Sequence, residues 1–405
     1  MMLSTMAHRV ARLGFVGTCG LILMQLGCGE KRSPAVPPFS AGELSTPVGG
    51  RPAVYLRQMA SQDKSQPQIL EAQILPGRGM NIYQLRAFLP GKGDIDMFVS
   101  PPLNQEAPKM NGGPEDFNGN ESFRVGGAIL VPYPNRIRGK LSADGKTIET
   151  SILTRTVRLP ANWQGKNPGA EKNAMHGLIL ASRMGDVTTY ADAQHASVTG
   201  VLHAGDFNGH WLSKTDLTIT ATLDKGAFGF TVDAKNVGND PLPVGIGWHP
   251  YFSFPSGDRR QARLHILATE RVLVNNYDDV FPTGKIVPVA RTQYDFTPAA
   301  GAPLDQLFMD DCFTDIQRDA SGHAVAHIID PAAKYGVRVT SLTPQVKAYQ
   351  AYAPVDKSFV AFEPQFNLGD PFSPLWQKGH ADTGMPVLNP GESVRYAVRV
   401  ELYVP

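Results

Sequence analysis

The clearest indication of fold class in this chain comes from residues 217–234, which read Leu217-Thr-Ile-Thr-Ala-Thr-Leu-Asp-Lys-Gly-Ala-Phe-Gly-Phe-Thr-Val-Asp-Ala234. Apolar side chains occupy alternate positions from Leu217 to Leu223 and again from Phe228 to Ala234, which is the period of a strand with one buried face. Between the two runs, Asp224-Lys225-Gly226 has the composition of a tight turn. The pattern therefore predicts an antiparallel hairpin.

Further stretches of the same kind lie on both sides of this hairpin. Short apolar or alternating runs, separated by glycine- and proline-rich turns, are typical of strands; they cover residues 53–56, 68–74, 83–89, 97–99, 326–329, 337–340 and 394–404. Residues 101–121 and 161–174 are polar and read as long loops. No long stretch has helical periodicity. We predict an all-β chain with one large domain, a sandwich of antiparallel sheets.

The composition narrows the class of function. The chain has 405 residues, of which 42% are hydrophobic and 19% charged, with a formal net charge of +1. This near-neutral balance gives no electrostatic reason to expect a nucleic-acid partner. Of the three cysteines only Cys312 lies in the predicted domain, so no intramolecular disulfide framework is expected.

The N-terminal residues resemble an export signal. Basic residues precede the apolar run Leu13–Gly27, which is short for a membrane span and ends at Cys28. We expect residues 1–28 to be a lipoprotein-type signal whose Cys28 is lipidated, residues 29–50 a flexible linker, and residues 51–405 the folded domain. Gln25 departs from the usual lipoprotein pattern, and a plain signal peptide or a retained anchor is the alternative. The expected location is the periplasm of a bacterium, with membrane contact only through the lipid at Cys28.

A proline-stiffened motif supplies the first candidate for chemistry. In Gly245-Ile-Gly-Trp-His-Pro-Tyr-Phe252, the proline restricts the backbone of His249 to an extended conformation. Its imidazole can transfer a proton near neutral pH, and the neighbouring aromatic rings suit the apolar face of a sugar. The alternative is a histidine that is only part of the core.

Other polar residues stand at the ends of predicted strands. Glu363 is an isolated carboxylate after Phe359-Val-Ala-Phe362, where burial would raise its pKa and make it a usable base. A structural glutamate paired with an arginine is the alternative. The remaining patches are Asn135-Arg136, His176-Gly177 and Asp310-Asp311-Cys312-Phe313.

Taken in order, these patches resemble the aldose 1-epimerases, or galactose mutarotases. The resemblance rests on Asn135-Arg136-Ile137, His176-Gly177, His249-Pro250-Tyr251-Phe252, an aspartate three residues before Phe313, and Glu363-x-Gln365. It covers about residue 51 to the C-terminus. It implies the galactose mutarotase-like supersandwich, a large antiparallel β-sandwich, and an activity that interconverts the anomers of a free aldose such as glucose or galactose.

The same resemblance implies a role for each residue. Glu363 matches the general base that takes the proton from the C1 hydroxyl, and His249 matches the acid that protonates the ring oxygen. Contacts to the sugar are implied for the substrate-binding residues Arg136, Asn135, His176, Asp310, Gln365 and Trp248. We prefer Asp310 to the adjacent Asp311 because Asp310 lies three residues before Phe313, which is the spacing of the aspartate in the family. Neither a metal nor an organic cofactor is implied, and the oligomeric state is left open.

Three other functions remain compatible with the sequence. A mutarotase for a hexose phosphate or an oligosaccharide would need other contacts, and Arg138 and Lys140 are candidates to hold a phosphate. A non-catalytic carbohydrate-binding lipoprotein would need no acid–base pair. A polysaccharide lyase or glycosidase is also possible on a β-sandwich, although most glycosidases use two carboxylates and only Glu363 looks placed for catalysis.

Overall fold

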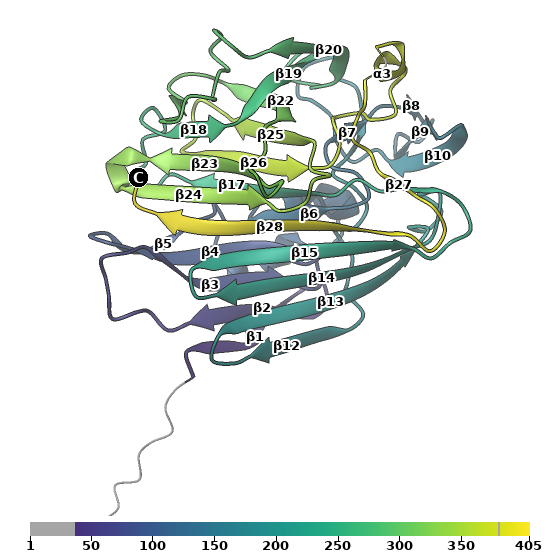
Figure 1. The fold of residues 1–405 in the computed structure, drawn as a ribbon. Helices are drawn as coiled ribbons and strands as arrows, with labels where there is room; N and C mark the ends of the chain where they lie inside the picture. The colour runs from purple at the N-terminus through teal and green to yellow at the C-terminus, as the bar shows by residue number, and fades with distance from the viewer. Residues whose placement is uncertain (1–36, 380) are drawn as a thin grey trace, which may run out of the picture. The chain divides into compact units, whose positions relative to one another are not determined.

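The computed structural model describes residues 37–379 and 381–405. The predicted signal over residues 1–28, with Cys28, and the first part of the predicted linker therefore lie outside the described residues. The described chain is built mainly from two large antiparallel sheets (Figure 1). None of its helices is both long enough and apolar enough to cross a membrane.

The larger sheet carries most of the N-terminal strands and the strands of the candidate site. In spatial order it contains β1 (Phe39–Val48), β2 (Arg51–Gln58), β3 (Gln68–Leu75), β4 (Asn81–Leu89), β6 (Gly127–Leu130), β17 (Gly247–Ser253), β26 (Phe359–Gln365), β25 (Ala348–Ala353), β22 (Met309–Ile316), β19 (Ala268–Val274) and β20 (Pro282–Pro288), with β5 (Gly93–Asp96) paired to β4.

The second sheet contains the hairpin that the sequence predicts over residues 217–234. Its order is β12 (Val187–Ala191), β13 (His195–Gly205), β14 (Thr215–Asp224), β15 (Ala227–Asn236), β28 (Ser393–Tyr403), β24 (Tyr335–Ser341), β23 (Ala324–Asp330), β18 (Arg263–Ile266) and β21 (Ala302–Pro303). Leu217 pairs with Ala234 and Asp224 with Ala227, and burial alternates along β14. The predicted hairpin is confirmed, and so is the all-β sandwich.

Short elements complete the described chain. Three small antiparallel sheets pair β8 (Lys140–Leu141), β9 (Thr147–Ile152) and β10 (Arg155–Pro160), β7 (Arg136–Ile137) and β11 (Ala174–Met175), and β16 (Leu242–Pro243) and β27 (Val387–Leu388). The helical turns are α1 (Leu103–Glu106), η1 (Ala107–Lys109), η2 (Pro114–Gly119), α2 (Asn120–Phe123), η3 (Pro331–Ala333) and α3 (Pro374–Lys378).

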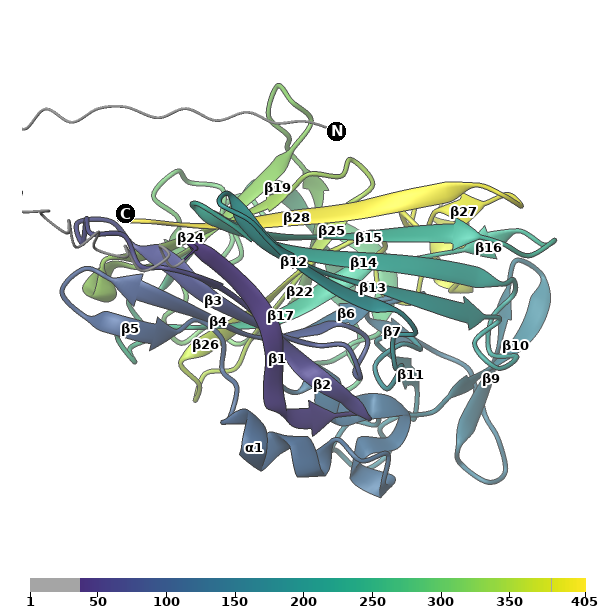
Figure 2. The ribbon, with the colours of Figure 1, turned by 90° about the horizontal axis from the view of Figure 1, so that it is seen from below.

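The core lies between the two large sheets. In Figure 2, β28, β15 and β14 form one layer, and β3 and β4 lie beneath it; β15 and β28 both contact β3. Buried side chains from both layers join in a single apolar cluster, to which Phe230 contributes from the smaller sheet and Trp248 and Phe362 from the larger one. Because successive side chains of a strand point to opposite faces, the neighbours His249 and Glu363 face away from this core.

The predicted linker is wrong over its last residues. Phe39–Val48 form strand β1, which pairs with β2 from Phe39↔Gln58 to Val48↔Arg51. Proline and glycine had suggested a flexible segment, but Phe39 and Val48 are both buried and attach the strand to the domain. The predicted strand at residues 97–99 is also reduced, to one bridge between Phe98 and Phe252.

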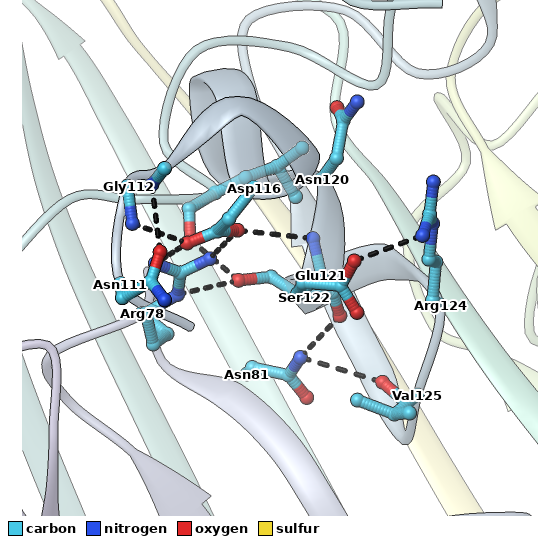
Figure 3. A network of polar contacts seen from close by, with 12 residues as sticks. Arg78, Asn81, Asn111, Gly112, Asp116, Asn120, Glu121, Ser122, Arg124 and Val125 are labelled. Atoms are coloured by element: carbon cyan, nitrogen blue, oxygen red, sulfur yellow. Dashed lines mark hydrogen bonds and ion pairs between the residues drawn. The ribbon is translucent and has the colours of Figure 1, made fainter. Parts of the chain in front are cut away.

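The predicted long loop at residues 101–121 is a packed segment of short helices. Arg78, in the turn between β3 and β4, donates to both carboxylate oxygens of Asp116 at 2.6 and 2.9 Å, and its Nε donates to the Ser122 hydroxyl at 2.7 Å (Figure 3). The same carboxylate accepts the backbone N–H groups of Gly112 and Glu121. The Arg78 and Asp116 side chains are 3% and 0% exposed. This buried ion pair fixes the segment to the large sheet, which polar composition alone does not reveal.

Candidate active site

Four neighbouring strands of the large sheet supply the floor of a cavity of about 320 Å³. β17 contributes His249, β26 contributes Glu363, β25 contributes Gln350 and Tyr352, and β22 contributes Asp310. The strand register places Gln350 opposite Glu363 and Tyr352 opposite Asp310. Cross-strand partners share a face of the sheet, so these side chains converge on one cavity.

The proposed acid and base are in direct contact. His249 Nε2 lies 3.3 Å from Glu363 Oε1, and the two side chains are 6% and 2% exposed. Burial lowers the pKa of His249 to about 4 and raises the pKa of Glu363 well above its ordinary value. Both shifts favour a pair that holds one proton between the carboxyl group and the imidazole at neutral pH.

Arg136 and Asn135 enter the cavity from a strained turn. Asn135 has a φ of 63°, in the left-handed region, and β7 begins immediately after it. Arg136 Nη2 lies 3.3 Å from Asp310 Oδ2, and its Nη1 lies 3.3 Å from Asn135 Oδ1. Asn135 also donates to Gln350 Oε1 at 3.0 Å, and Gln350 donates to Asp310 Oδ1 at 2.5 Å. These bonds hold the four polar side chains of Asn135, Arg136, Gln350 and Asp310 in one network at the cavity.

His176 is brought beside His249 by the pairing of β11 with β7. Met175 pairs with Arg136, and the His176 N–H donates to the Asn135 carbonyl at 2.9 Å. The φ of His176 is 63°, and such backbone strain gathers at functional sites. The imidazole rings of His176 and His249 are 4.8 Å apart. Burial and the neighbouring His249 and Arg136 lower the pKa of His176 well below its ordinary value, so it is a neutral hydrogen-bonding group.

Several buried polar atoms of the cavity lack a partner within the described part of the chain. They are His249 Nδ1, His176 Nδ1, Arg136 Nε and Glu363 Oε2. Leaving a buried donor or acceptor unpaired costs about 1–3 kcal/mol. Four such atoms around one cavity are typical of a site that binds a polar ligand.

Two predicted contacts are not in the cavity. Trp248 is fully buried in the core, where it packs against Phe98, Phe230 and Phe252, and its Nε1 donates to the Gly127 carbonyl at 3.1 Å. The strand alternation that directs His249 outward directs Trp248 inward, so the prediction that Trp248 contacts the sugar is wrong.

Gln365 is the second correction. Its side chain is fully buried and donates through Nε2 to the Asn367 carbonyl at 2.7 Å, and it does not line the cavity. Immediately after β26, the Phe366 N–H donates to the Ile246 carbonyl at 2.9 Å. Of the two aspartates, Asp310 lines the cavity, whereas Asp311 is paired with Arg271 and accepts a hydrogen bond from Tyr277.

The aromatic contact expected from Trp248 is supplied by other residues. Tyr251, two positions after His249, lines the cavity with its ring 4.9 Å from that imidazole. Phe123 lies 4.9 Å from the His176 ring. Tyr251 belongs to the quoted motif and could be found by strand alternation. No local pattern marks the other lining residues, which are Phe123, Arg124, Trp163, Gly165, Lys166, Met175, Tyr277, Asp278, Phe308, Gln350 and Tyr352.

Arg138 and Lys140, the candidates to hold a phosphate if the substrate were a hexose phosphate, also lie outside this cavity. Arg138 pairs with Glu171 at 3.0 Å and stacks on Phe281, and Lys140 is exposed at the start of β8. Neither residue lines the cavity. The phosphate clamp that these two residues would form is therefore not built.

An antiparallel β-sandwich with a polar cavity on one sheet, in which a buried carboxyl group contacts a buried imidazole, defines the class of this protein by fold and site. The sequence model of the aldose 1-epimerase family matches residues 102–401, and the chain belongs to that family. A search of curated proteins gave no significant match.

Solved structures agree on the fold. The chain is similar to a galactose mutarotase-like protein from Clostridium acetobutylicum, with 19% identity, a TM-score of 0.68 and coverage of 91% of this chain and 99% of that one. It is also similar to the galactose 1-epimerase of Lactobacillus acidophilus, with 17% identity, a TM-score of 0.60 and coverage of 91% and 99%. An aldose epimerase homologue from C. elegans matches with 16% identity, a TM-score of 0.60 and coverage of 84% and 97%. At these identities the likeness establishes the shared fold.

Proposed function

We propose that this protein is an aldose 1-epimerase that interconverts the α and β anomers of a free aldose such as glucose or galactose. The observation that carries the proposal is the contact between His249 and Glu363 in a buried cavity, at 3.3 Å. A binding protein has no need of a buried carboxyl group beside a buried imidazole, because each costs desolvation free energy. Ring opening of a hemiacetal needs one group that removes a proton and one that supplies it.

In this proposal the two residues exchange roles during the reaction. As the sugar binds, the shared proton of the pair passes from Glu363 to His249. Glu363 then takes the proton of the C1 hydroxyl while His249 donates its proton to the ring oxygen, and the C1–O5 bond breaks to give an aldehyde. Rotation about C1–C2 presents the other face of the carbonyl group. Ring closure then returns the proton from Glu363 to the C1 oxygen and the proton of the O5 hydroxyl to His249, so the pair is restored.

The remaining polar wall would hold the sugar hydroxyls. Arg136 and Asp310 form a pair that can donate to one hydroxyl and accept from its neighbour, and Asn135 and Gln350 extend the same network. His176, kept neutral by its lowered pKa, can accept or donate at the ring region. The Tyr251 ring faces the sugar from the side of His249.

Polarimetry on freshly dissolved α-D-glucose and α-D-galactose tests the activity. The protein should speed the approach to equilibrium, and Glu363→Gln should lower that rate by about 10²–10⁴-fold. Glu149→Gln, at an exposed glutamate outside the cavity, is the matched control and should retain the parent rate. Sugar binding without any acceleration would favour the non-catalytic carbohydrate-binding function instead.

We further propose that the chain is exported and lipidated at Cys28, a proposal supported by the sequence of residues 1–28 alone. Metabolic labelling of the expressing bacterium with palmitate should mark the protein, and Cys28→Ser should abolish the label. An unlabelled parent protein recovered from the soluble fraction would contradict lipidation.

A further inference from the structure

A second cavity of about 560 Å³ adjoins the catalytic cavity along residues 161–166. Trp163 lines both cavities, whereas Gln164 faces the second cavity and Gly165 and Lys166 face the first. The other residues of the second cavity on which the argument depends are Phe117, Asn120, Lys146 and Lys172. None of these four residues lines the catalytic cavity.

The walls of the second cavity have the chemistry of a carbohydrate site. Phe117, in η2, is 38% exposed, and Trp163 is half-buried. Within the described chain, no acceptor is bonded to the Trp163 indole N–H and no hydrogen bond or ion pair engages the Lys146 ammonium group, so both donors remain available. Aromatic faces bury the apolar face of a pyranose, and a few polar groups orient its hydroxyls.

The position of Trp163 suits a second sugar residue. The Phe123 ring lies 4.9 Å from the ring of His176 on one side and 5.7 Å from the ring of Trp163 on the other. Trp163 is therefore one aromatic ring beyond His176. The Trp163 backbone is fixed by two hydrogen bonds with Asn173, of 2.9 and 3.2 Å, so its position is set by the fold.

We propose that the second cavity binds the next sugar residue of a reducing oligosaccharide whose reducing-end ring occupies the catalytic cavity, with its anomeric centre at the Glu363–His249 pair. This proposal rests on the proposed mutarotase function and specifies its substrate class. The anomeric carbon of the reducing end faces the acid–base pair, and the glycosidic bond crosses beside Trp163. The second residue then packs on Phe117, with Lys146 at its hydroxyls. A monosaccharide would fill only the first cavity.

The kinetic test compares reducing disaccharides with their monosaccharides. KM and kcat for mutarotation are measured by polarimetry with glucose, galactose, maltose, cellobiose and lactose, on the full chain and on Phe117→Ala. At least one disaccharide should have a lower KM than glucose, and Phe117→Ala should raise that KM about 2–10-fold while the monosaccharide KM stays unchanged. Lys146→Ala, at another residue of the second cavity, should act in the same direction.

Tyr190→Ala is the matched control, because Tyr190 is 55% exposed on β12 and lines neither cavity. It should leave every KM unchanged. Equal KM values for disaccharides and glucose in the parent, or equal changes for both in Phe117→Ala and Lys146→Ala, would overturn the second sugar site.

Calorimetric titration separates failure of this inference from failure of the proposed function. If no sugar mutarotates faster with the protein, the proposed function is wrong, and the same disaccharides are titrated into the parent and Phe117→Ala. Tighter binding than glucose that weakens in the variant would uphold the second site. Absence of that difference would overturn it.

Discussion

The Nε2 atom of His249 lies 3.3 Å from the Oε1 atom of Glu363, and neither side chain is more than 6% exposed. A carboxyl group and an imidazole in such contact behave as one titrating unit, with macroscopic pKa values that belong to the pair. The singly protonated pair contains one group that can release a proton and one that can accept it. In the proposed mechanism, only this form of the pair opens and recloses the hemiacetal ring.

The pH dependence of kcat/KM should follow the proton count of this pair. Burial lowers the pKa of His249 to about 4, so below that pH the pair holds two protons and the base is lost. Burial raises the pKa of Glu363 well above 4.5, and once the shared proton leaves the acid is lost. We expect a broad bell with its acid limb near pH 4, measured by polarimetry from about pH 3.5 to about pH 10 against Glu363→Gln in the same buffers. An acid limb near the 6.5 of an exposed histidine would contradict the burial of the pair.

Substitution of the two adjacent aspartates should affect different properties: catalytic efficiency for Asp310 and the free energy of unfolding for Asp311. Asp310→Asn removes the charge that Arg136 contacts in the cavity, and we expect kcat/KM to fall about 10–100-fold. Asp311→Asn leaves Arg271 without its buried partner outside the cavity, and it should lower the free energy of unfolding by about 1–3 kcal/mol. Polarimetry and urea unfolding on both variants check this. The reverse pattern would move the sugar contact to Asp311.

Most of the fold and of the candidate site could be predicted from two features of the sequence, strand alternation and the order of the motifs. The hairpin around Asp224-Lys225-Gly226 was correct because its turn and its period-two pattern are local. His249, Glu363, Arg136, Asn135, His176 and Asp310 all lie at the cavity, as the order of the motifs implied. These residues stand on neighbouring strands or on the paired strands β7 and β11, so their convergence depends on sheet topology that the family resemblance supplied.

The failures arose where long-range contacts decide the outcome. β17 is buried along most of its length, so hydrophobicity does not tell whether the Trp248 or the His249 side chain points into the core. Residues 101–121 are polar, but Arg78 binds Asp116 across 38 positions of the sequence and makes the segment part of the domain. The partner of a buried charge is chosen by tertiary packing, and composition does not record it.

The Arg78–Asp116 pair should stabilise the domain and position the cavity wall. Asp116→Asn leaves a buried guanidinium group uncompensated, and we expect the free energy of unfolding to fall by about 3–5 kcal/mol. The double variant Arg78→Met with Asp116→Leu removes both charges, and its free energy of unfolding should fall less than that of Asp116→Asn. Since α2 follows Asp116 and carries Phe123, KM for the sugar should rise more than kcat falls in Asp116→Asn.

Asp233→Asn supplies the comparison for this pair. Asp233 binds Arg395 on the surface, with side chains 35% and 66% exposed, and its loss should cost about 0–1 kcal/mol. Thermal and urea unfolding measure both pairs. If Asp116→Asn is as stable as Asp233→Asn, the buried pair does not anchor the segment.

Trp248→Phe and Tyr251→Leu should separate the core face of β17 from its cavity face. Trp248→Phe removes the indole bond to the Gly127 carbonyl and leaves a gap among Phe98, Phe230 and Phe252, so the free energy of unfolding should fall by about 1–3 kcal/mol. Its KM for the sugar should remain that of the parent, because no atom of Trp248 reaches the cavity. Tyr251→Leu removes a ring 4.9 Å from His249 and should raise KM about 2–10-fold at nearly parental stability. Urea unfolding gives the free energy of unfolding of each variant, and polarimetry gives its KM for the sugar. A raised KM with unchanged stability in Trp248→Phe would return that side chain to the sugar and place Tyr251 outside the contact.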